Sequence, residues 1–426
     1  MGLKIAVSKE TKEFEKRVAA SPETVKKLVS LGCSVNIQSG AGKAASFTDD
    51  AYKAAGGKIT KSTEDTIKSA DIVLSVAAPT DAITKHIKKG ALLIGLLAPH
   101  SDQKIIETCK KSGIDAFSME LVPRITRAQS MDVLSSQSNL AGYKAVLDAT
   151  EHFTRAFPMM MTAAGTVPPA KVFVMGAGVA GLQAIATARR LGAIVSATDV
   201  RPAAKEQVES LGATFIAVED EEFKQAETAG GYAKEMSKTY QRKQQVLVED
   251  TIKKQDIVIT TALIPGRPAP KLITEAMIKS MQPGSVIVDL AVETGGNSAL
   301  SKAGQVVDAG GVKIVGHNNV PSRLATNASA LYAKNIYNLL ALIIDKENGK
   351  LSIDWEDDII KGVALTRDGK SIHPNFTGAK SKAPAKPAIK KTPEKKKPSA
   401  KKASFRSIGI RSTSKAIVAL SPTFNS

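Results

Sequence analysis

Hydrophobic residues in the first 120 positions occur in short runs that alternate with longer stretches of helical spacing. Parallel strands need crossover helices between them, so this alternation predicts a doubly wound α/β lobe. The first predicted helix begins after Ser21, has Pro22 in its first turn and ends before Gly32. The predicted strands of this lobe cover residues 3–7, 34–38, 71–77, 91–97 and 115–118.

The same alternation restarts near Lys171 and predicts a second lobe of the same kind. Residues 136–157 are expected to form one long helix between the lobes, and residues 321–345 a second helix that returns the chain to the first lobe. We therefore expect an α/β fold of two Rossmann-like, doubly wound parallel-sheet lobes. The first lobe would comprise residues 1–135 and 321–376, and the second residues 136–320, with strands at 172–175, 194–198, 214–218, 256–260, 285–289 and 312–315.

The net charge of +18 is concentrated at one end of the chain. Residues 379–426 contain eleven Lys, two Arg and a single Glu, with many Pro and Ala and few large apolar residues. Such a composition predicts a largely disordered tail over residues 377–426. No nucleic-acid-binding motif accompanies the basic tail, so a specific nucleic-acid partner is not expected. The two cysteines, Cys33 and Cys109, have no metal-binding spacing and are expected to be buried thiols.

A glycine-rich segment carries the clearest chemical signal. The sequence Gly176-Ala177-Gly178-Val179-Ala180-Gly181 directly follows the strand 172–175 and opens a predicted helix, which is the position of a dinucleotide-binding turn. Asp199 ends the next strand, eighteen residues after Gly181, where a carboxylate binds the ribose hydroxyls of the adenosine. A carboxylate there also repels the extra phosphate of NADP, so NAD(H) is favoured, although Arg201 tempers this preference.

The segment 123–135 is dense in polar residues and lies where one predicted lobe passes into the other. Ligand clefts are common at such junctions. Gln129 and Ser135 offer donors and acceptors suited to a carboxamide or a ribose. Residue chemistry alone leaves open a second interpretation, in which the segment is a solvated loop that caps a helix.

The mainly polar stretch 219–250 is long for a connection between two Rossmann strands and contains Gly230-Gly231-Tyr232-Ala233. Long connections of this kind often form lids over a binding site. A surface helical insertion with a Gly-Gly break is the alternative that the sequence leaves open.

Three motifs together resemble domain I of the proton-translocating transhydrogenases. They are Arg127-Ala128-Gln129-Ser130-Met131-Asp132 with the following Ser135 to Tyr143, the segment 164–170, and the glycine turn 176–181. The resemblance extends over residues 3–376. It implies that segment 124–135 holds the dihydronicotinamide, with Arg124, Gln129, Asp132 and Ser135 at the hydride-donating end, and that a mobile loop with Tyr232 at its tip closes on the nucleotide.

The resemblance also implies an activity and its partners. NAD(H) would bind to this chain, and hydride would pass to NADP(H) held by an NADP-binding subunit, coupled to proton translocation by transmembrane subunits. A homodimer, docked by its partners on the cytoplasmic face of a membrane, is expected, with no metal. The nucleotide contacts that the resemblance implies are Arg124, Ile125, Thr126, Arg127, Gln129, Asp132, Gly176, Gly178, Val179, Gly181, Asp199, Val200, Arg201, Gly231, Tyr232, Ala262 and Leu263.

The chain is also similar to alanine dehydrogenase over both lobes, including the early Arg17-Val18-Ala19. In that family a substrate lysine and a catalytic histidine align with Ala77 and Ala98 of this sequence. His100 lies two residues beyond Ala98, and Glu293 stands where that family has an active-site Asp. Oxidation of an amine requires a positioned acid or base, whereas hydride exchange between two nicotinamides requires positioning alone. A free-standing amino-acid dehydrogenase and a non-catalytic NAD-binding regulator are the alternatives to a transhydrogenase subunit.

Overall fold

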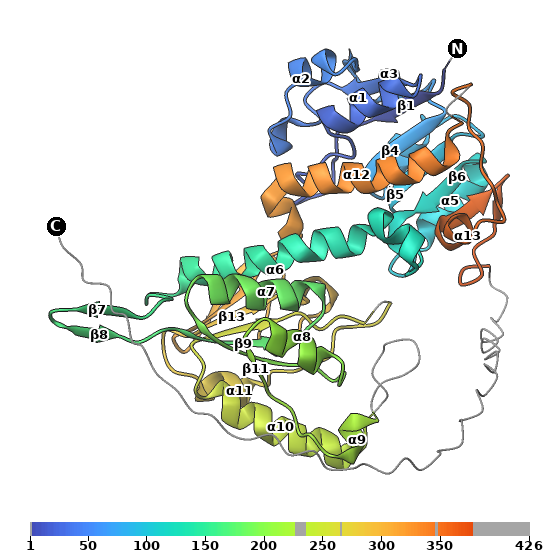
Figure 1. Cartoon of the computed structure of the whole chain (residues 1–426). Helices are drawn as coiled ribbons and strands as arrows, with labels where there is room; N and C mark the ends of the chain where they lie inside the picture. The colour runs from blue at the N-terminus through green and yellow to red at the C-terminus, as the bar shows by residue number, and fades with distance from the viewer. Residues whose placement is uncertain (1, 226–235, 265, 346–347, 378–426) are drawn as a thin grey trace, which may run out of the picture. The chain divides into compact units, whose positions relative to one another are not determined.

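The computed structural model of the chain describes residues 2–225, 236–264, 266–345 and 348–377 (Figure 1). Within these residues the strands form two large sheets and a two-stranded hairpin. The predicted disordered tail lies outside the described residues from position 378 onward. The α/β class with two Rossmann-like lobes, each built on a largely parallel sheet, is confirmed.

The first sheet has eight strands in the order β17-β16-β6-β5-β4-β1-β2-β3. Its six strands β1 to β6 are parallel, whereas β16 pairs antiparallel with β6, and β17 antiparallel with β16. The short strands β3, β16 and β17 escaped prediction because runs of two to four residues leave little hydrophobic pattern. The strands are β1 (Lys4–Val7), β2 (Ser34–Gln38), β3 (Lys58–Thr60), β4 (Ile72–Ala77), β5 (Leu92–Leu96), β6 (Asp115–Ser118), β16 (Ala364–Arg367) and β17 (Lys370–Ser371).

Side chains of this sheet point alternately to two separate cores. Ile5 and Val7 of β1 lie in one core, and Ala6 between them lies in the other. Buried Cys33 and Cys109 contribute one thiol to each core, as expected, and burial raises the pKa of Cys109 to about 12. The helices of this lobe are α1 (Pro22–Ser30), α2 (Asp49–Ala54), α3 (Thr63–Ile67), α4 (Asp81–Thr84), α5 (Lys104–Ser112) and α13 (Asp358–Val363), with the 3₁₀ segments η1 (Lys43–Ala45), η2 (Met119–Leu121) and η3 (Thr126–Met131).

The second sheet has seven strands in the order β11-β10-β9-β12-β13-β15-β14. All its neighbours are parallel except β14 and β15, which form an antiparallel edge pair. The strands are β9 (Lys171–Met175), β10 (Ile194–Thr198), β11 (Thr214–Phe215), β12 (Ile257–Thr260), β13 (Val286–Asp289), β14 (Gln305–Ala309) and β15 (Val312–Gly316). The helices are α7 (Val179–Arg190), α8 (Ala204–Ser210), α9 (Glu221–Lys224), α10 (Lys238–Ile252) and α11 (Glu275–Ser280), with η4 (Val292–Thr294).

Two long helices, α6 (Val133–His152) and α12 (Ala325–Ile343), the latter preceded by η5 (Val320–Leu324), join the lobes. Helix α6 starts three residues earlier than predicted because the Asp132 side chain caps it, and it ends at His152 because the backbone of Phe153 is extended. Helix α6 packs closely on α7: a Cβ at Gly142 would lie 2.0 Å from the carbonyl oxygen of Ala180, so this contact requires glycine.

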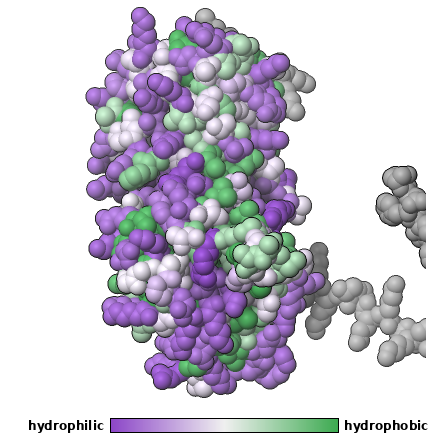
Figure 2. Space-filling model, turned by 90° about the vertical axis from the view of Figure 1, so that its left-hand side faces the viewer, coloured by the Kyte–Doolittle hydropathy of each residue, from purple (hydrophilic) through white to green (hydrophobic). Residues whose placement is uncertain are grey.

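The hairpin of β7 (Met160–Thr162) and β8 (Gly165–Val167), which the sequence did not predict, extends from the second lobe (Figure 1). Its side chains Met159, Met160 and Met161 are 59%, 44% and 79% exposed. On the face shown in Figure 2, hydrophobic residues lie scattered among hydrophilic ones. No helix within the described residues has the length and apolarity needed to cross a membrane.

Candidate dinucleotide site

The glycine turn follows the central strand of the second sheet, at the point where the strand order reverses. Strand β9 lies between β10 and β12, and ligands of open α/β sheets bind at the carboxyl ends of the strands beside such a reversal. Gly176 has φ +105°, and a Cβ at Gly181 would lie 1.8 Å from the carbonyl oxygen of Gly176. Both positions therefore require glycine for the turn itself and for the close packing of α7.

Gly178 is different, because the surrounding chain does not require glycine there. Its φ is −75°, and a Cβ at this position would meet no atom of the described residues within 4 Å. Gly178 is the N-cap residue of α7, and a helix N-terminus attracts anionic groups. The residues present thus fit a pyrophosphate that approaches the backbone at Gly178.

Asp199 follows β10 and lies beside this turn. One carboxylate oxygen accepts a hydrogen bond from the backbone N–H of Ala177 (2.8 Å), and the guanidinium of Arg201 binds both carboxylate oxygens at 2.9 Å. The Asp199 side chain is 7% exposed, and that of Arg201 is 33% exposed. The glycine turn, Asp199 and Arg201 are therefore linked by hydrogen bonds, and the guanidinium of Arg201 partly neutralises the carboxylate of Asp199.

The loop after β12 closes the other side of the turn. The Thr261 hydroxyl donates to the carbonyl oxygen of Gly176 (3.0 Å). The buried Asn297 accepts from the backbone N–H of Ala262 (3.1 Å) and donates to the carbonyl oxygens of Ala262 (2.9 Å) and Pro270 (2.8 Å). The sequence does not reveal the role of Asn297, because the backbone groups that it binds lie 27 and 35 positions away.

Exposed apolar side chains accompany the polar groups. Val179, Val200, Leu263 and Ile125, all predicted nucleotide contacts, are between 38% and 55% exposed. Solvent-exposed side chains of this size provide surface that the flat rings of a nucleotide can cover.

Segment 124–135 combines exposed polar side chains with buried anchors. Arg124, Thr126 and Gln129 are exposed, whereas Ala128 and Met131 are buried in the core of the first lobe. Ala128 and Met131 therefore anchor the segment in the core, while its polar side chains face solvent.

Asp132 and Ser135 bind each other at the start of α6. The carboxylate of Asp132 accepts from the backbone N–H of Ser135 (2.9 Å) and from its hydroxyl (2.5 Å). This is a helix N-cap, so the alternative interpretation of the segment as a capping loop describes part of its structure correctly. The two side chains act as a pair that orients the first turn of α6.

Arg127 is directed to the first lobe. Its guanidinium donates to the carboxylate of Asp357 (2.6 Å), the N-cap residue of α13. This hydrogen bond lowers the pKa of Asp357, although desolvation acts in the opposite direction. Of the predicted contacts, Gly231 and Tyr232 lie outside the described residues.

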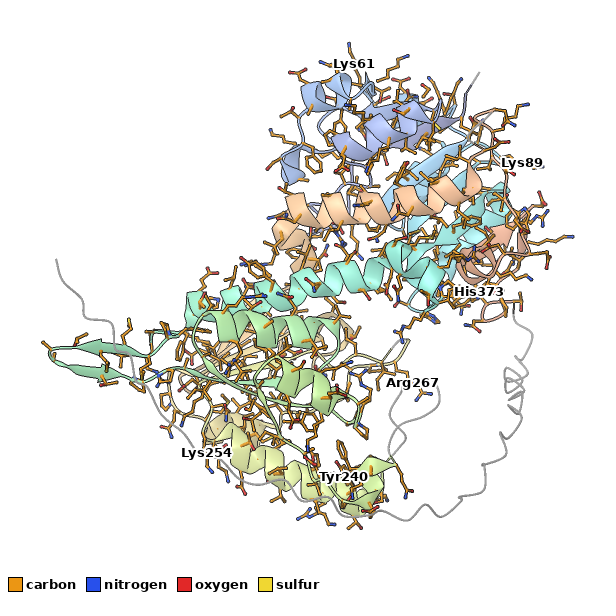
Figure 3. The ribbon with its side chains drawn as sticks, viewed as in Figure 1. Lys61, Lys89, Tyr240, Lys254, Arg267 and His373 are labelled. Carbon is orange, nitrogen blue, oxygen red and sulfur yellow. The ribbon has the colours of Figure 1, made fainter. Side chains whose placement is uncertain are left out.

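The positions aligned with the substrate residues of alanine dehydrogenase lie at the strand ends of the first sheet. Ala77 ends β4, and its backbone N–H donates to the carboxylate of Glu10 (3.3 Å). The His100 ring packs against Phe376 at 5.0 Å between centroids, and Phe376 packs against His373 at 5.0 Å. His373 is labelled in Figure 3 together with Arg267, which follows Gly266; a Cβ at Gly266 would lie 3.6 Å from His100. His100 is thus held in an aromatic contact beside the loop after β12.

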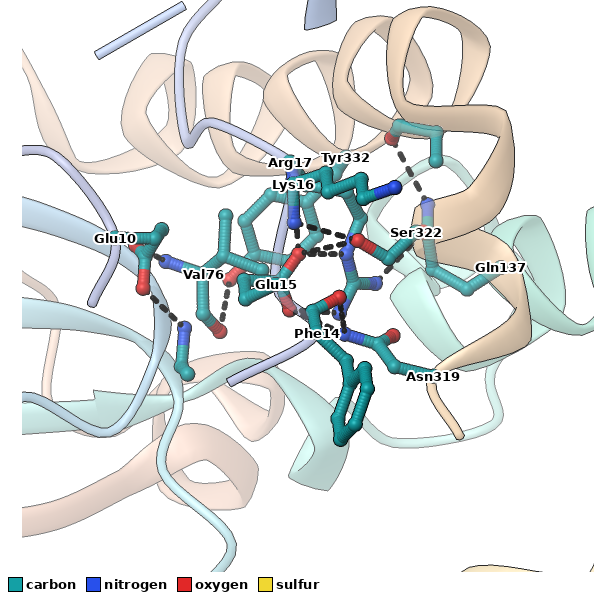
Figure 4. Close-up of polar contacts among 12 residues, drawn as sticks. Glu10, Phe14, Glu15, Lys16, Arg17, Val76, Gln137, Asn319, Ser322 and Tyr332 are labelled. Atoms are coloured by element: carbon teal, nitrogen blue, oxygen red, sulfur yellow. Dashed lines mark hydrogen bonds and ion pairs between the residues drawn. The ribbon is translucent and has the colours of Figure 1, made fainter. Parts of the chain in front are cut away.

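A buried polar network connects residues 15–17 with both long helices (Figure 4). The guanidinium of Arg17 binds both carboxylate oxygens of Glu15 (2.8 and 2.7 Å) and donates to Gln137 of α6 (2.8 Å). Glu15 also accepts from the side-chain amide of Asn319 (2.9 Å) and from the Ser322 hydroxyl (3.2 Å). Arg17 is therefore bound by partners within the chain.

The sheet order and the glycine turn define a protein of the nucleotide-binding, Rossmann-like class. Residues 6–141 match the family model described as alanine dehydrogenase/PNT, N-terminal domain, and residues 145–374 match the C-terminal domain model. The chain therefore belongs to the alanine dehydrogenase/PNT family, which confirms the resemblance on which the sequence analysis relied.

Within this family the chain is more similar to transhydrogenase subunits than to alanine dehydrogenase. It is 57% identical over 382 residues to the first part of NAD(P) transhydrogenase subunit alpha of Rhodospirillum rubrum, covering 88% of this chain and 99% of that one. Alanine dehydrogenase of Mycobacterium tuberculosis is 30% identical over 297 residues, covering 69% and 74% of the two chains. The crystal structure of transhydrogenase from Sinorhizobium meliloti matches with a TM-score of 0.79 and 53% identity, covering 87% of this chain and 100% of that one.

Proposed function

We propose that this chain is the NAD(H)-binding subunit of a proton-translocating NAD(P) transhydrogenase, and that it passes hydride to NADP⁺ held by an NADP-binding partner subunit. The observation that carries the proposal is the glycine turn at the strand-order reversal, where the side-chain position of Gly178 is open and Asp199 lies alongside. Similarity to a transhydrogenase alpha subunit over 88% of the chain supports this assignment over other dinucleotide enzymes.

Each part of the site has a separate task in this proposal. The turn 176–181 binds the pyrophosphate, and Asp199, Val200 and Arg201 bind the adenosine end, where the carboxylate selects against a 2′-phosphate. Ala262 and Leu263 border the site on the side of β12. Bound NADH supplies the hydride.

The residues of segment 124–135 orient the reacting ring. Arg124 and Gln129 are exposed side chains on an anchored backbone, and Asp132 holds Ser135 in place. Hydride exchange between two nicotinamides moves no proton at the reacting carbons, so these residues need no acid–base role. Because Ala77 and Ala98 carry no titratable side chain, an amino-acid dehydrogenase activity finds no support at these positions.

The proposed assembly includes a second copy of the chain. Three adjacent exposed methionines on a projecting hairpin form an apolar surface, which favours burial against another protein. We propose a homodimer that uses this hairpin and docks through its partners on the cytoplasmic side of a membrane that contains the proton-translocating subunits.

The lobe boundaries at residues 135, 320 and 376 are part of the proposal, supported by the pairing of β16 and β17 with the first sheet.

The experiment that tests the function compares nucleotide binding with hydride transfer. Calorimetric titration of the purified chain should show tighter binding of NADH than of NADPH. In single-turnover assays with the NADP-binding subunit, Q129N should lower the rate of hydride transfer by at least about tenfold while changing the NADH dissociation constant by less than that.

The matched control is Q282N, which makes the same change at an exposed glutamine that precedes the amino end of β13. It should leave both quantities unchanged. Tighter binding of NADPH, or NADH formation by the chain alone with alanine as substrate, would overturn the proposed function.

A further inference from the structure

Two side chains of α12 hold one carbonyl oxygen in segment 124–135. The side-chain amides of Asn335 and Asn338 donate to the carbonyl oxygen of Ser130 at 2.8 and 2.9 Å. Ser130 lies in η3, between Gln129 and Met131, and the two asparagines lie 205 and 208 positions further along the chain. The contact is therefore a tertiary one that local sequence does not reveal.

Two donors on one carbonyl oxygen restrict the backbone more than one does. A carbonyl oxygen has two lone pairs, and a donor on each opposes rotation of the peptide plane about the chain direction. This plane joins Ser130 to Met131 within η3, the short 3₁₀ segment that also contains Gln129. The pair of asparagines thus fixes the orientation of a backbone that carries exposed polar side chains.

Asn335 binds the start of α6 as well. Its side-chain oxygen accepts from the hydroxyl of Ser136 (2.8 Å), which lies in the first turn of α6 beside Ser135. Gln137, one residue further, donates to the carbonyl oxygen of Ala328 in α12 (3.1 Å). Asn335 is 7% exposed, so a single buried amide joins η3, α6 and α12.

We propose that Asn335 and Asn338 are positioning residues for hydride transfer. They act through Ser130 and Ser136, and so fix the direction in which Gln129 and the Asp132–Ser135 pair face the reacting ring. This inference rests on the proposed function of segment 124–135. A misplacement of reacting groups by about 1 Å can reduce a rate by roughly a hundredfold, so a small loss of backbone order has a large effect.

The first test replaces the donor without changing the shape. N335D keeps an acceptor for Ser136 but removes the amide donor to Ser130. N338A removes the second donor at a half-buried position, where only a small loss of stability is expected. The matched controls N327D and N327A alter an exposed asparagine of the same helix that makes no hydrogen bond to Ser130.

Two quantities are measured in each variant. Hydrogen exchange of the backbone amides in residues 124–135, which needs no partner and no nucleotide, should accelerate by about tenfold in N335D, by less in N338A and not in the controls. Single-turnover hydride transfer with the NADP-binding subunit should fall by about tenfold in N335D and by about threefold in N338A, while the NADH dissociation constant changes by less than about threefold.

Each adverse outcome identifies what has failed. Unchanged exchange in both variants would show that the asparagines do not hold the segment. Faster exchange with an unchanged rate of hydride transfer would show that the asparagines play no part in that transfer. If the transfer rate and the NADH affinity fall by the same factor and the melting temperature falls with them, the asparagines are structural residues only. If the parent chain transfers no hydride with its partner, the proposed function fails and the transfer role with it, while the exchange data still decide whether the asparagines hold the segment.

Discussion

The two lobes share the order of the five strands around the reversal point but differ in the residues that follow the central strand. Strand β1 lies between β2 and β4 as β9 lies between β10 and β12. After β9 the backbone turns at Gly176 and leaves the side-chain position of Gly178 open. After β1 the carboxylate of Glu10 accepts from the backbone N–H groups of Val76 (2.6 Å) and Ala77 (3.3 Å) at the end of β4. The shared topology creates the same place twice, and the residue types decide whether a glycine turn or a buried carboxylate lies there.

The charges of the first lobe are largely satisfied by one another. Burial raises the pKa of Glu10 to about 7, although its two backbone hydrogen bonds act in the opposite direction. Nearby, Arg17 binds Glu15, and this contact keeps the pKa of the Glu15 carboxyl below its ordinary value despite burial. The first lobe thus has an internal charge network at this point, whereas the second lobe has an open backbone turn beside an acid that is paired with the half-exposed Arg201.

The strongest challenge to this comparison is a pair of glycine substitutions. G181A places a Cβ 1.8 Å from the carbonyl oxygen of Gly176, so α7 must shift; NADH affinity should fall by more than about a hundredfold, roughly 3 kcal/mol. G178A places its Cβ in open space and should melt like the parent, yet it should bind NADH at least about tenfold more weakly, since only the ligand is obstructed. Calorimetric unfolding and NADH titration measure both effects. Parent-like NADH affinity in G178A would show that the ligand does not approach this turn.

A second substitution tests the charge beside the open turn. D199A removes the carboxylate and releases the Arg201 guanidinium from it, which favours a phosphate over ribose hydroxyls. The ratio of NADH to NADPH affinity should fall by at least about tenfold, or roughly 1.4 kcal/mol. D308A, at an exposed acid of β14 that pairs with Lys313, serves as the control and should leave the ratio unchanged. An unchanged ratio in D199A would show that residues other than Asp199 select between NADH and NADPH.

A third test uses pH to examine Glu10 at the reversal point of the first lobe. Because the folded-state pKa of Glu10 (about 7) exceeds the ordinary 4.5, the folded protein binds more protons than the unfolded chain between these values. Glu10 therefore contributes a loss of stability as pH rises from about 4.5 to 7. E10Q should match the parent near pH 4.5 and exceed its unfolding free energy by about 1–2 kcal/mol at about pH 8, as measured by urea unfolding. Equal pH slopes in the two proteins would show that Glu10 is not buried as described.

The smallest effect is expected at Arg127. Its exposed guanidinium pairs with Asp357 within the first lobe, so it resembles the internal charges of that lobe more than the ligand-facing groups of the second. R127A should change NADH affinity by less than about threefold, because exposed ion pairs contribute little. R124A, at the other exposed arginine of the segment, provides the comparison in the same titration. A large loss of NADH affinity in R127A would show that Arg127 contacts the nucleotide.

Much of the fold was predictable because apolar runs and helical spacing coincide in both lobes. The strands β1, β2, β4, β9, β10 and β12 lie within the predicted ranges or differ from them by a residue. Strand β17 was not predicted because two residues show no hydrophobic pattern. The edge strand β14 was not predicted because its conformation depends on hydrogen bonds to its antiparallel partner β15.

The glycine turn and Asp199 were found from sequence because their spacing is local and physically constrained. The nucleotide contacts built on them stay predictions. Asn297 and Asn335 could not have been found in this way, because their importance lies in backbone groups 35 and 205 positions distant. Likewise, the pairing of Arg127 with Asp357 depends on where the C-terminal part of the first lobe returns.

The close contact of Gly142 with Ala180 makes α6 a spacer of fixed length between the two ends of the proposed site. Asp132 caps one end of this helix, and ten residues later Gly142 packs against the helix that carries the glycine turn. Each helical residue adds about 1.5 Å and about 100° of rotation, so an insertion or deletion between these points would change both the span and the facing of segment 124–135. We expect descendants of this sequence to vary in length in their surface loops, and to keep the residue count between Asp132 and Gly142 unchanged.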